Sequence, residues 1–329
     1  MSKLSKKDTI WIDWVYDGRS QNLAKRFGVI YYSLGYFSDK PKVAYVFLRY
    51  LLASFKTISL IITKNPKVVI MTGSPPFPHF IVYYLSKIKK IKFIIDTHSG
   101  YFDDKKFHIL PELRKKIMAE AFFHIVTNDM HKKIIESNNG RGHILGVLIE
   151  DENDIKGYNF VKDNNFVWIS GYHYDEPLEI VFDVAKRMPD VNIYITGNIK
   201  KAPKIFVEKS SLFNNIILTG FLSEKIYISY IKGSTGVIAL TTRDNTMQRG
   251  AYEALSYNTP IITSNWNLLK ESFFKGTVHI NNTAVELEEA IRSICNNRDK
   301  FRAEIEDLKN THKKYFDNKI SEINTLLHD

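Results

Sequence analysis

The residues best suited to chemistry lie together in one polar segment in the second half of the chain, TTRDNTMQRGAYEAL (241–255). A helix is predicted to begin near residues 246–247, which places Gln248 and Arg249 in its first turn. Helix N-terminal amides and a nearby arginine suit a phosphate, which needs donors and positive charge in a small space. Glu253 shares a helix face with Arg249, so the pair is either an ordinary surface ion pair or a site where the carboxylate accepts two ribose hydroxyls.

A second group of candidates follows an apolar run in the first half, in DTHSGYFDD (96–104). Aspartate and histidine at a strand end are able to act as general bases. We interpret His98 as lining a site and Asp103 and Asp104 as candidate bases, whereas Asp96, nearer the strand, suits a structural hydrogen-bond acceptor. A lone histidine is more often structural, and both roles stay open for His98. No acidic pair at ligand spacing accompanies the phosphate candidate, so no metal site is predicted.

Both segments follow predicted strands. Along the chain, short apolar runs alternate with amphipathic segments of helical length. The predicted strands are residues 9–14, 29–34, 68–73, 93–98, 123–128, 143–149, 166–170, 191–197, 215–220, 236–242, 260–264 and 277–281. Such alternation is typical of parallel sheets covered by helices on both faces. Polar loops follow nearly every run, where ligands bind in open α/β sheets.

The domain prediction follows from a polar, aperiodic segment, residues 150–165, which is typical of a linker. We predict an α/β chain of two doubly wound, Rossmann-like domains that face each other across a cleft. The first domain takes residues 1–150 and the second residues 166–298. A helical segment, 299–329, is expected to pack back on the first domain.

Composition excludes several classes of protein. The 329 residues are 44% hydrophobic and 25% charged, which is typical of a folded globular chain. One cysteine, Cys295, excludes an internal disulfide framework and a multi-cysteine metal site, and we interpret it as a buried bystander thiol. We find neither a signal peptide nor an uninterrupted apolar run, so the expected compartment is the reducing cytosol without a spanning helix.

The excess of positive over negative charge is confined to the first half. Residues 1–150 carry 24 Lys and Arg against 12 Asp and Glu, a balance of +12, whereas the remainder carries 22 against 24, a balance of −2. This favours an anionic partner for the first half, although a lysine-rich solubilising surface fits as well. Residues 19–64 are apolar, aromatic and basic, as in a helix at a lipid interface, or else they form a buried helix with Arg49 and Lys56 in water. The charge balance favours a peripheral membrane protein.

The order and spacing of several motifs resemble those of GT-B glycosyltransferases of the GT4-like group. The resemblance is carried by residues 241–266, where a glutamate opens an E-A-L run before a Thr-Pro strand start, and by SGYHYDEPLE (170–179) and TGFLSEK (219–225). In the first half, SPPFP (74–78) followed by FIIDTHSGY (93–101) is similar to elements of the lipid-linked β-1,4-mannosyltransferases. The resemblance covers most of the chain.

The resemblance implies roles for individual residues. Glu253 would hold the donor ribose, the loop before its helix would contact the diphosphate and sugar, and backbone near Phe221 and Leu222 would receive the nucleobase. The full donor-binding set is Gly171, Tyr172, Phe221, Leu222, Arg243, Asn245, Thr246, Gln248, Arg249 and Glu253. On the acceptor side stand Gly18, Arg19 and Ser74, and the catalytic candidates are His98, Asp103 and Asp104. No cofactor and no metal is implied.

This sequence departs from the family's pattern at two places. Asn245 stands where many relatives carry the first of two glutamates, and it cannot stabilise positive charge on a sugar ring. Ser170, Gly171 and Tyr172 follow the first strand of the second domain, where relatives place a basic residue. We expect arginines of the 243–249 segment to supply the missing charge.

The function that the resemblance implies is transfer of a sugar from a nucleotide sugar to a glycan acceptor, expected to be lipid-linked, in cell-surface polysaccharide or glycolipid synthesis. The expected place is the inner face of the cell membrane. A non-catalytic sugar-nucleotide-binding subunit stays open as an alternative. A nucleic-acid-binding protein is disfavoured because the aromatic residues do not alternate with Arg and Lys in any recognisable RNA- or DNA-binding motif. An NAD oxidoreductase is disfavoured because D-G-R-S, not G-x-G-x-x-G, follows the first strand.

Overall fold

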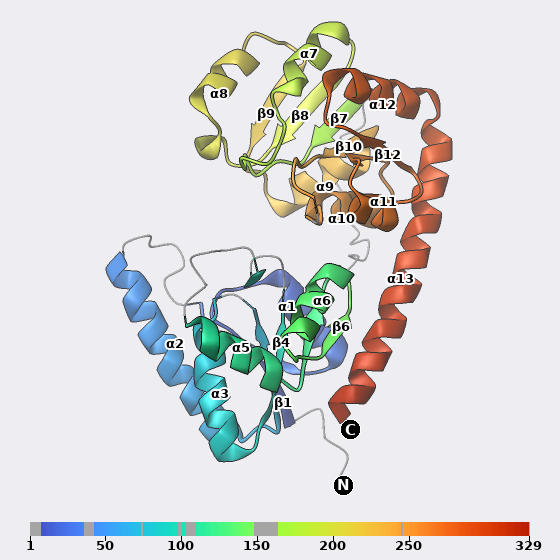
Figure 1. Ribbon diagram of the computed structural model, residues 1–329. Coiled ribbons are helices and arrows are strands. Elements are labelled where there is room, and N and C mark those ends of the chain that lie inside the picture. The colour runs from blue at the N-terminus through green and yellow to red at the C-terminus, as the bar shows by residue number, and fades with distance from the viewer. Residues whose placement is uncertain are drawn as a thin grey trace. The chain divides into compact units, whose positions relative to one another are not determined.

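The structure is a computed structural model that describes residues 8–35, 43–73, 75–97, 101–102, 110–147, 164–244 and 246–328 (Figure 1). Contacts divide the chain into two compact units. The first comprises Met1–Leu148 together with Tyr315–Asp329, and the second comprises Ile149–Lys314. The predicted linker falls almost wholly outside the described residues.

The first unit is a six-stranded parallel sheet in the order β2-β1-β3-β4-β5-β6. Its elements are β1 (Thr9–Asp13), α1 (Gly18–Phe27), β2 (Ile30–Ser33), α2 (Val43–Lys64), β3 (Val68–Thr72), α3 (Phe77–Lys89), β4 (Lys92–Asp96), α5 (Pro111–Glu120), β5 (Phe123–Val126), α6 (Asp129–Ser137) and β6 (Gly142–Ile144). The strand order reverses between β1 and β3, and ligands bind beyond the carboxyl ends of strands at such a point.

Both faces of this sheet are buried because alternate residues of each strand pack against different helices. On one face, Ile10 and Ile12 of β1 join a core that includes Ile61 of α2. On the other face, Trp11 packs in a core with Phe27 of α1. That second core also contains Phe316, Ile323 and Leu327 from the end of the chain.

The second unit is also a six-stranded parallel sheet, in the order β12-β11-β10-β7-β8-β9. Its elements are β7 (Asn165–Trp168), α7 (Ile180–Arg187), β8 (Asn192–Thr196), the short 3₁₀ helix η3 (Ile199–Lys201), α8 (Lys204–Ser210), β9 (Ile216–Gly220), α9 (Glu224–Gly233), β10 (Gly236–Ala239), α10 (Arg249–Ser256), β11 (Ile261–Ser264), α11 (Asn267–Ser272), β12 (Thr277–Ile280), α12 (Ala284–Asn296) and α13 (Arg298–His328). Here the order reverses between β7 and β10. The predicted pair of doubly wound parallel sheets is therefore confirmed.

One local expectation needs correction, and one helix bears on the membrane prediction. The helix expected near residues 246–247 begins at Arg249, because Gln248 has extended backbone with φ −91° and ψ 107°. Among the described residues, one helix is long and apolar enough to cross a membrane by length and composition, since Val46–Lys64 of α2 has a mean hydropathy of 1.5. No spanning helix was predicted here, because the sequence shows no uninterrupted apolar run.

Candidate functional site

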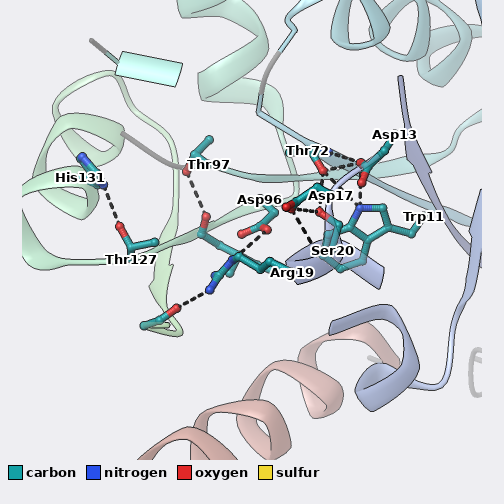
Figure 2. Close-up of polar contacts among 12 residues, drawn as sticks. Trp11, Asp13, Asp17, Arg19, Ser20, Thr72, Asp96, Thr97, Thr127 and His131 are labelled. Carbon is teal, nitrogen blue, oxygen red and sulfur yellow. Dashed lines mark hydrogen bonds and ion pairs between the residues drawn. The ribbon is translucent and has the colours of Figure 1, made fainter. Parts of the chain in front are cut away.

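A polar cluster lies at the carboxyl ends of β1 and β3 in the first unit, where the strand order reverses (Figure 2). Asp13 ends β1, Thr72 ends β3, and Asp17 and Ser20 belong to the start of α1. Asp17 is the N-cap of α1 and accepts the Ser20 backbone N–H at 3.1 Å. This cap fixes the first turn of the helix and thereby turns the Ser20 hydroxyl toward β3.

The four side chains are joined by three oxygen–oxygen contacts. Ser20 Oγ lies 2.8 Å from Asp17 Oδ2 and 2.8 Å from Thr72 Oγ1, and Thr72 Oγ1 makes a short contact with Asp13 Oδ1. Each contact needs one proton between its oxygens, but two hydroxyl groups supply only two. A carboxyl group therefore contributes the third proton when all three bonds form.

Asp13 is the carboxyl group that best carries this proton. Its side chain is buried, and burial raises the pKa of Asp13 to about 6, although hydrogen bonds from Thr72, Tyr31, Trp11 and Ser20 oppose the shift. Trp11 Nε1 donates to Asp13 Oδ1 at 3.1 Å and orients the carboxyl. The cluster is therefore a hydrogen-bonded chain that gains or loses a proton near neutral pH.

Arg19, expected on the acceptor side, lies next to this cluster on α1. Its Nε is 3.5 Å from Asp96 Oδ2, and its Nη1 donates to the Gly146 carbonyl at 2.8 Å (Figure 2). The Asp96 side chain is fully buried, whereas that of Arg19 is 16% exposed. Arg19 therefore ties the start of α1 to the ends of β4 and β6. Gly18, also expected there, is the first residue of α1.

Four predicted residues of the first unit, Ser74, His98, Asp103 and Asp104, lie outside the described residues. Two described residues near them in the sequence, His79 and Tyr101, are buried. The fully buried His79 ring lies with Nε2 2.8 Å from the Thr72 carbonyl, and burial lowers the pKa of His79 to about 4. His79 is therefore neutral near pH 7. Tyr101, also buried, packs on His79 and accepts from Arg114 Nη2 at its carbonyl, at 2.8 Å.

In the second unit, Glu253 and Arg249 lie on one face of α10, as their spacing predicts. Arg249 Nε donates to Glu253 Oε1 at 3.0 Å, and the Tyr227 hydroxyl of α9 makes a short hydrogen bond to Glu253 Oε2. The Glu253 side chain is 17% exposed and that of Arg249 80%. A pair with one partner in water contributes little to stability. Tyr227 fixes the position of the carboxylate, and it is a contact that spacing did not predict.

The loop before α10 is held by the loop after β7. Thr241 Oγ1 donates to Asp175 Oδ2 at 2.8 Å and accepts the Arg243 backbone N–H at 3.1 Å. Gly250, in the first turn of α10, lies so close to Ile169 that an added Cβ would be 3.0 Å from the Ile169 side chain. The strand-order reversal of this sheet therefore brings the 241–244 loop, the start of α10 and the end of β7 together.

Gly171 and Tyr172, both expected to bind the donor, face a carboxylate of the same loop. Their backbone N–H groups donate to Glu176 Oε1 at 2.9 Å and Oε2 at 3.2 Å, and the Ser170 hydroxyl donates to Oε2 at 2.5 Å. Consecutive amides of this kind form an anion-binding concavity. Glu176 fills it, so a phosphate would gain these amides only by replacing Glu176.

The remaining donor-side candidates lie around α9 and α10. Phe221, 86% exposed, and Leu222 follow β9 and precede α9, whose Tyr227 contacts Glu253. Thr246 Oγ1 donates to the Asp244 carbonyl at 3.4 Å. Gln248 is the N-cap of α10 but makes no side-chain cap bond, and Asn245 lies outside the described residues.

Sequence reasoning missed Asp13, Ser20 and Thr72 in the first unit and Tyr227 and Asp175 in the second. An acid at the carboxyl end of the buried strand TIWID was the available signal for Asp13, because the three residues before it are all apolar. Among the described residues, no group of three or more His, Cys, Asp or Glu side chains is able to hold a metal ion.

No protein-family model matches the chain, and no curated protein matches its sequence. Its fold is similar to that of several solved structures. Sucrose-phosphate synthase from Thermosynechococcus elongatus matches with a TM-score of 0.70 at 11% identity, over 97% of this chain and 98% of that one. HepE from Anabaena in complex with UDP matches with a TM-score of 0.67 at 12% identity, over 97% of each chain.

A third structure, from Listeria monocytogenes and assigned as a UDP-N-acetylglucosamine 2-epimerase, matches with a TM-score of 0.58 at 12% identity, over 91% of each chain. Identities this low establish the fold alone. The chain has the two-domain, Rossmann-like fold of the GT-B glycosyltransferases, as predicted. The GT4-like group and the mannosyltransferase resemblance stay predictions.

Proposed function

We propose that the protein transfers a sugar from a nucleotide sugar, with UDP as the nucleotide, to a glycan acceptor. The observation that carries the proposal is the placement of Glu253 on the first turns of α10, at the point where strand order reverses. Its two oxygens are oriented by Arg249 of the same helix and by Tyr227 of α9. HepE, which shares the fold, is in complex with UDP. The fold alone does not define a reaction, so the site must carry the argument.

The chemistry required of the second unit is recognition of a nucleoside diphosphate. The N-terminal amides of α10 receive no side-chain cap from Gln248, and they carry the positive end of the helix dipole. Arg243 and Arg249 add positive charge at the same loop, which compensates for the absence of a basic residue at Ser170–Tyr172. Glu253 accepts ribose hydroxyls and exchanges its present partners for them.

In the transfer step, an acceptor oxygen forms a bond to the anomeric carbon while the bond from that carbon to the phosphate oxygen breaks. The electron pair leaves with the nucleoside diphosphate. The acceptor proton goes to a base if the configuration inverts, and His98, Asp103 and Asp104 are the proposed candidates. If the configuration is retained, the leaving phosphate takes the proton, and His98 serves to bind the sugar. We propose that neither route uses a metal ion or cofactor.

We propose further that the acceptor is lipid-linked, that the protein serves cell-surface polysaccharide or glycolipid synthesis, and that it works at the inner face of the cell membrane without binding nucleic acid. The support is the balance of +12 in residues 1–150 and the resemblance of the 74–101 region to enzymes with lipid-linked acceptors. An acceptor screen that compares free sugars with lipid-linked sugars tests this part separately.

The decisive experiment is a panel of UDP, GDP and other nucleotide sugars, read by thermal shift and by release of free nucleotide. We expect UDP sugars to raise the melting temperature and to release UDP. Binding without release, with or without an acceptor, would identify a non-catalytic partner subunit. A changed sugar that stays on the nucleotide would identify an epimerase instead.

Substitution of Glu253 and Tyr227 tests the site itself. Glu253→Ala removes the proposed ribose contacts and is expected to weaken UDP binding by about 1.5–3 kcal/mol, roughly tenfold to a hundredfold, as for hydrogen bonds to a charged group. Tyr227→Phe leaves the carboxylate but releases one oxygen, so we expect a smaller loss. Calorimetric titration with UDP measures both. Unchanged affinity in Glu253→Ala, with the melting temperature preserved, would remove Glu253 from the donor site.

A further inference from the structure

One face of α2 exposes a continuous row of large apolar side chains. They recur every three to four residues and so form one stripe along the helix. The stripe comprises Phe47, 73% exposed, Leu48, 40%, Leu51, 42%, Leu52, 39%, Phe55, 63%, and Ile62, 54%. Folded proteins rarely leave so many apolar side chains together in water unless the surface binds something. We call this row the α2 stripe.

The opposite face of α2 fixes the direction of the stripe. Ala53, Leu60 and Ile61 are buried in the core that covers the sheet of the first unit. Thr57 is also buried, and its Oγ1 accepts the Trp14 indole N–H at 2.9 Å. Figure 1 shows α2 at the outside of this unit, beside α3. A helix anchored in this way keeps its stripe turned away from the core.

The charged residues of α2 and α3 themselves are all positive, although Lys87 forms an ion pair with Glu120 of α5. The helix α2 contains Arg49, Lys56 and Lys64, and α3 contains Lys87 and Lys89, whereas neither helix contains an Asp or Glu. Lys89 Nζ donates to Asn65 Oδ1 at 3.3 Å, which places the basic end of α3 beside that of α2.

The neighbouring helix α3 adds two exposed apolar side chains of its own. Tyr84 is 57% exposed and Ile88 is 78% exposed. Both lie in the stretch of α3 that also holds its two lysines. The two helices therefore combine apolar and aromatic contact groups with cations.

We propose that the α2 stripe docks into the headgroup region of an anionic phospholipid membrane, with α2 lying along the membrane while its other face stays packed on the first unit. An amphipathic helix with aromatic and aliphatic groups on one side and lysines beside them binds lipid interfaces in this way. A second copy of this chain is a poor occupant, because a symmetric contact would bring Arg49 and Lys56 toward their own copies without any carboxylate in either helix. Crossing the membrane would break the contacts of Thr57 and Ile61 with the core.

The test uses the full chain and vesicles, and it does not depend on the proposed transfer reaction. The chain is sedimented with vesicles of phosphatidylcholine alone and with vesicles that also contain phosphatidylglycerol. We expect binding to the second kind, weakened by salt because surface charges are screened. Phe47→Glu with Phe55→Glu should lower the affinity by about tenfold or more, because apolar area is lost and the added negative charges are repelled by the anionic lipid.

Two further variants complete the design. Ile205→Glu with Leu212→Glu changes equally exposed apolar residues of the second unit, 71% and 79% exposed, and should leave vesicle binding unchanged. Lys56→Glu with Lys64→Glu should remove the preference for phosphatidylglycerol. The melting temperature of each variant shows that it is folded.

Several results would overturn the proposal. One is a wild-type chain that binds neither vesicle, and another is an equal loss of binding in the stripe and control variants. Retention in the vesicles after a carbonate wash would show a spanning helix instead. A chain that is dimeric without lipid, and monomeric after Phe47→Glu with Phe55→Glu, would show that a second copy covers the stripe. If an added acidic protein binds the wild-type chain through the α2 stripe and prevents it from binding vesicles, that protein and not the membrane would be the occupant.

Discussion

At the scale of single residues, the chain of oxygens from Asp13 through Thr72 and Ser20 to Asp17 is the least ordinary feature of the first unit. Its middle contact joins Ser20 Oγ to Thr72 Oγ1 at 2.8 Å. This contact is a hydrogen bond together with the two outer ones only while either Asp13 or Asp17 is protonated. Coupled carboxyls of this kind titrate as a pair. Tyr31 of β2 also faces this group, and burial, followed by the charge of Asp13, raises the pKa of its phenol.

Asp13→Asn tests the protonation of this chain. The folded pKa of Asp13 lies above its ordinary value, at about 6 against 3.8, so its contribution to stability is full below about pH 4 and is lost as pH rises through about 6. The loss amounts to about 3 kcal/mol for a shift of about two pKa units. The substituted amide is uncharged and keeps a donor, so the variant should lack this fall. Urea denaturation from about pH 4 to about pH 8 measures it.

The control for Asp13→Asn is Asp17→Asn, because asparagine caps a helix as well as aspartate does. Asp17→Asn should keep the fall in stability between about pH 4 and pH 6. An identical pH dependence in the wild type and Asp13→Asn would show that Asp13 is ionised throughout this range.

The candidate residues show what sequence can and cannot supply at this scale. The spacing of Arg249 and Glu253 defines a shared helix face without any tertiary information, and the structure places them 3.0 Å apart. Tyr227 and Asp175 were not predictable, because each meets its partner from a different element, 26 and 66 residues away along the chain. Gly171 and Tyr172 were predicted to bind the donor, but spacing alone did not reveal that Glu176, five residues after Gly171, accepts from both of their backbone N–H groups.

At the scale of elements, the strands of the described residues overlap the predicted apolar runs. Strands such as β1 and β3 are buried on both faces and therefore need an uninterrupted apolar sequence, whereas β2 is partly exposed. Several strands end before the predicted apolar runs do. Trp14, for example, continues the apolar pattern after the hydrogen-bonded strand β1 has ended at Asp13. The start of α10 was predicted too early because residues 246–248 suit a helix N-terminus by composition. Their backbone instead continues the loop that Asp175 and Thr241 hold.

Gly250 determines how closely α10 approaches β7. A valine there places its Cβ about 3.0 Å from Ile169, and overpacking of this kind costs about 1–3 kcal/mol. Gly250→Val should therefore lower stability and, because α10 must shift, weaken UDP binding as well. Ile169→Ala in the same chain should restore part of both, as a double-mutant cycle measures. Independent effects of the two substitutions would contradict the contact.

At the scale of the whole molecule, the chain returns to its first unit at its end. Phe316, Ile323 and Leu327 of α13 are buried against the same side of the sheet as Trp11, Leu23 and Phe27. The charged, amphipathic pattern of residues 299–329 predicts the helical segment. The chain rejoins the first unit at Tyr315. This position could not be predicted, because it depends on contacts with the core that no local sequence pattern encodes.

Ile323→Ala tests this arrangement. Removing a fully buried isoleucine should cost about 2–5 kcal/mol of unfolding free energy, in the unfolding transition of the first unit. Asn318→Ala on an exposed position of the same helix should change it by less than about 0.5 kcal/mol. Differential scanning calorimetry with and without UDP separates the two units, because the nucleotide should stabilise only the second. A loss confined to the second unit would contradict the assignment.

The same return of the chain sets a schedule for synthesis on the ribosome. The sheet that contains Trp11 is made before α13, so one of its two faces lacks Phe316, Ile323 and Leu327 until synthesis has reached residue 327. The second unit, Ile149–Lys314, is complete before that moment. The first unit therefore completes its core after the second unit, although most of the first unit is translated earlier. In the interval, its uncovered apolar face is a substrate for chaperones that bind nascent chains.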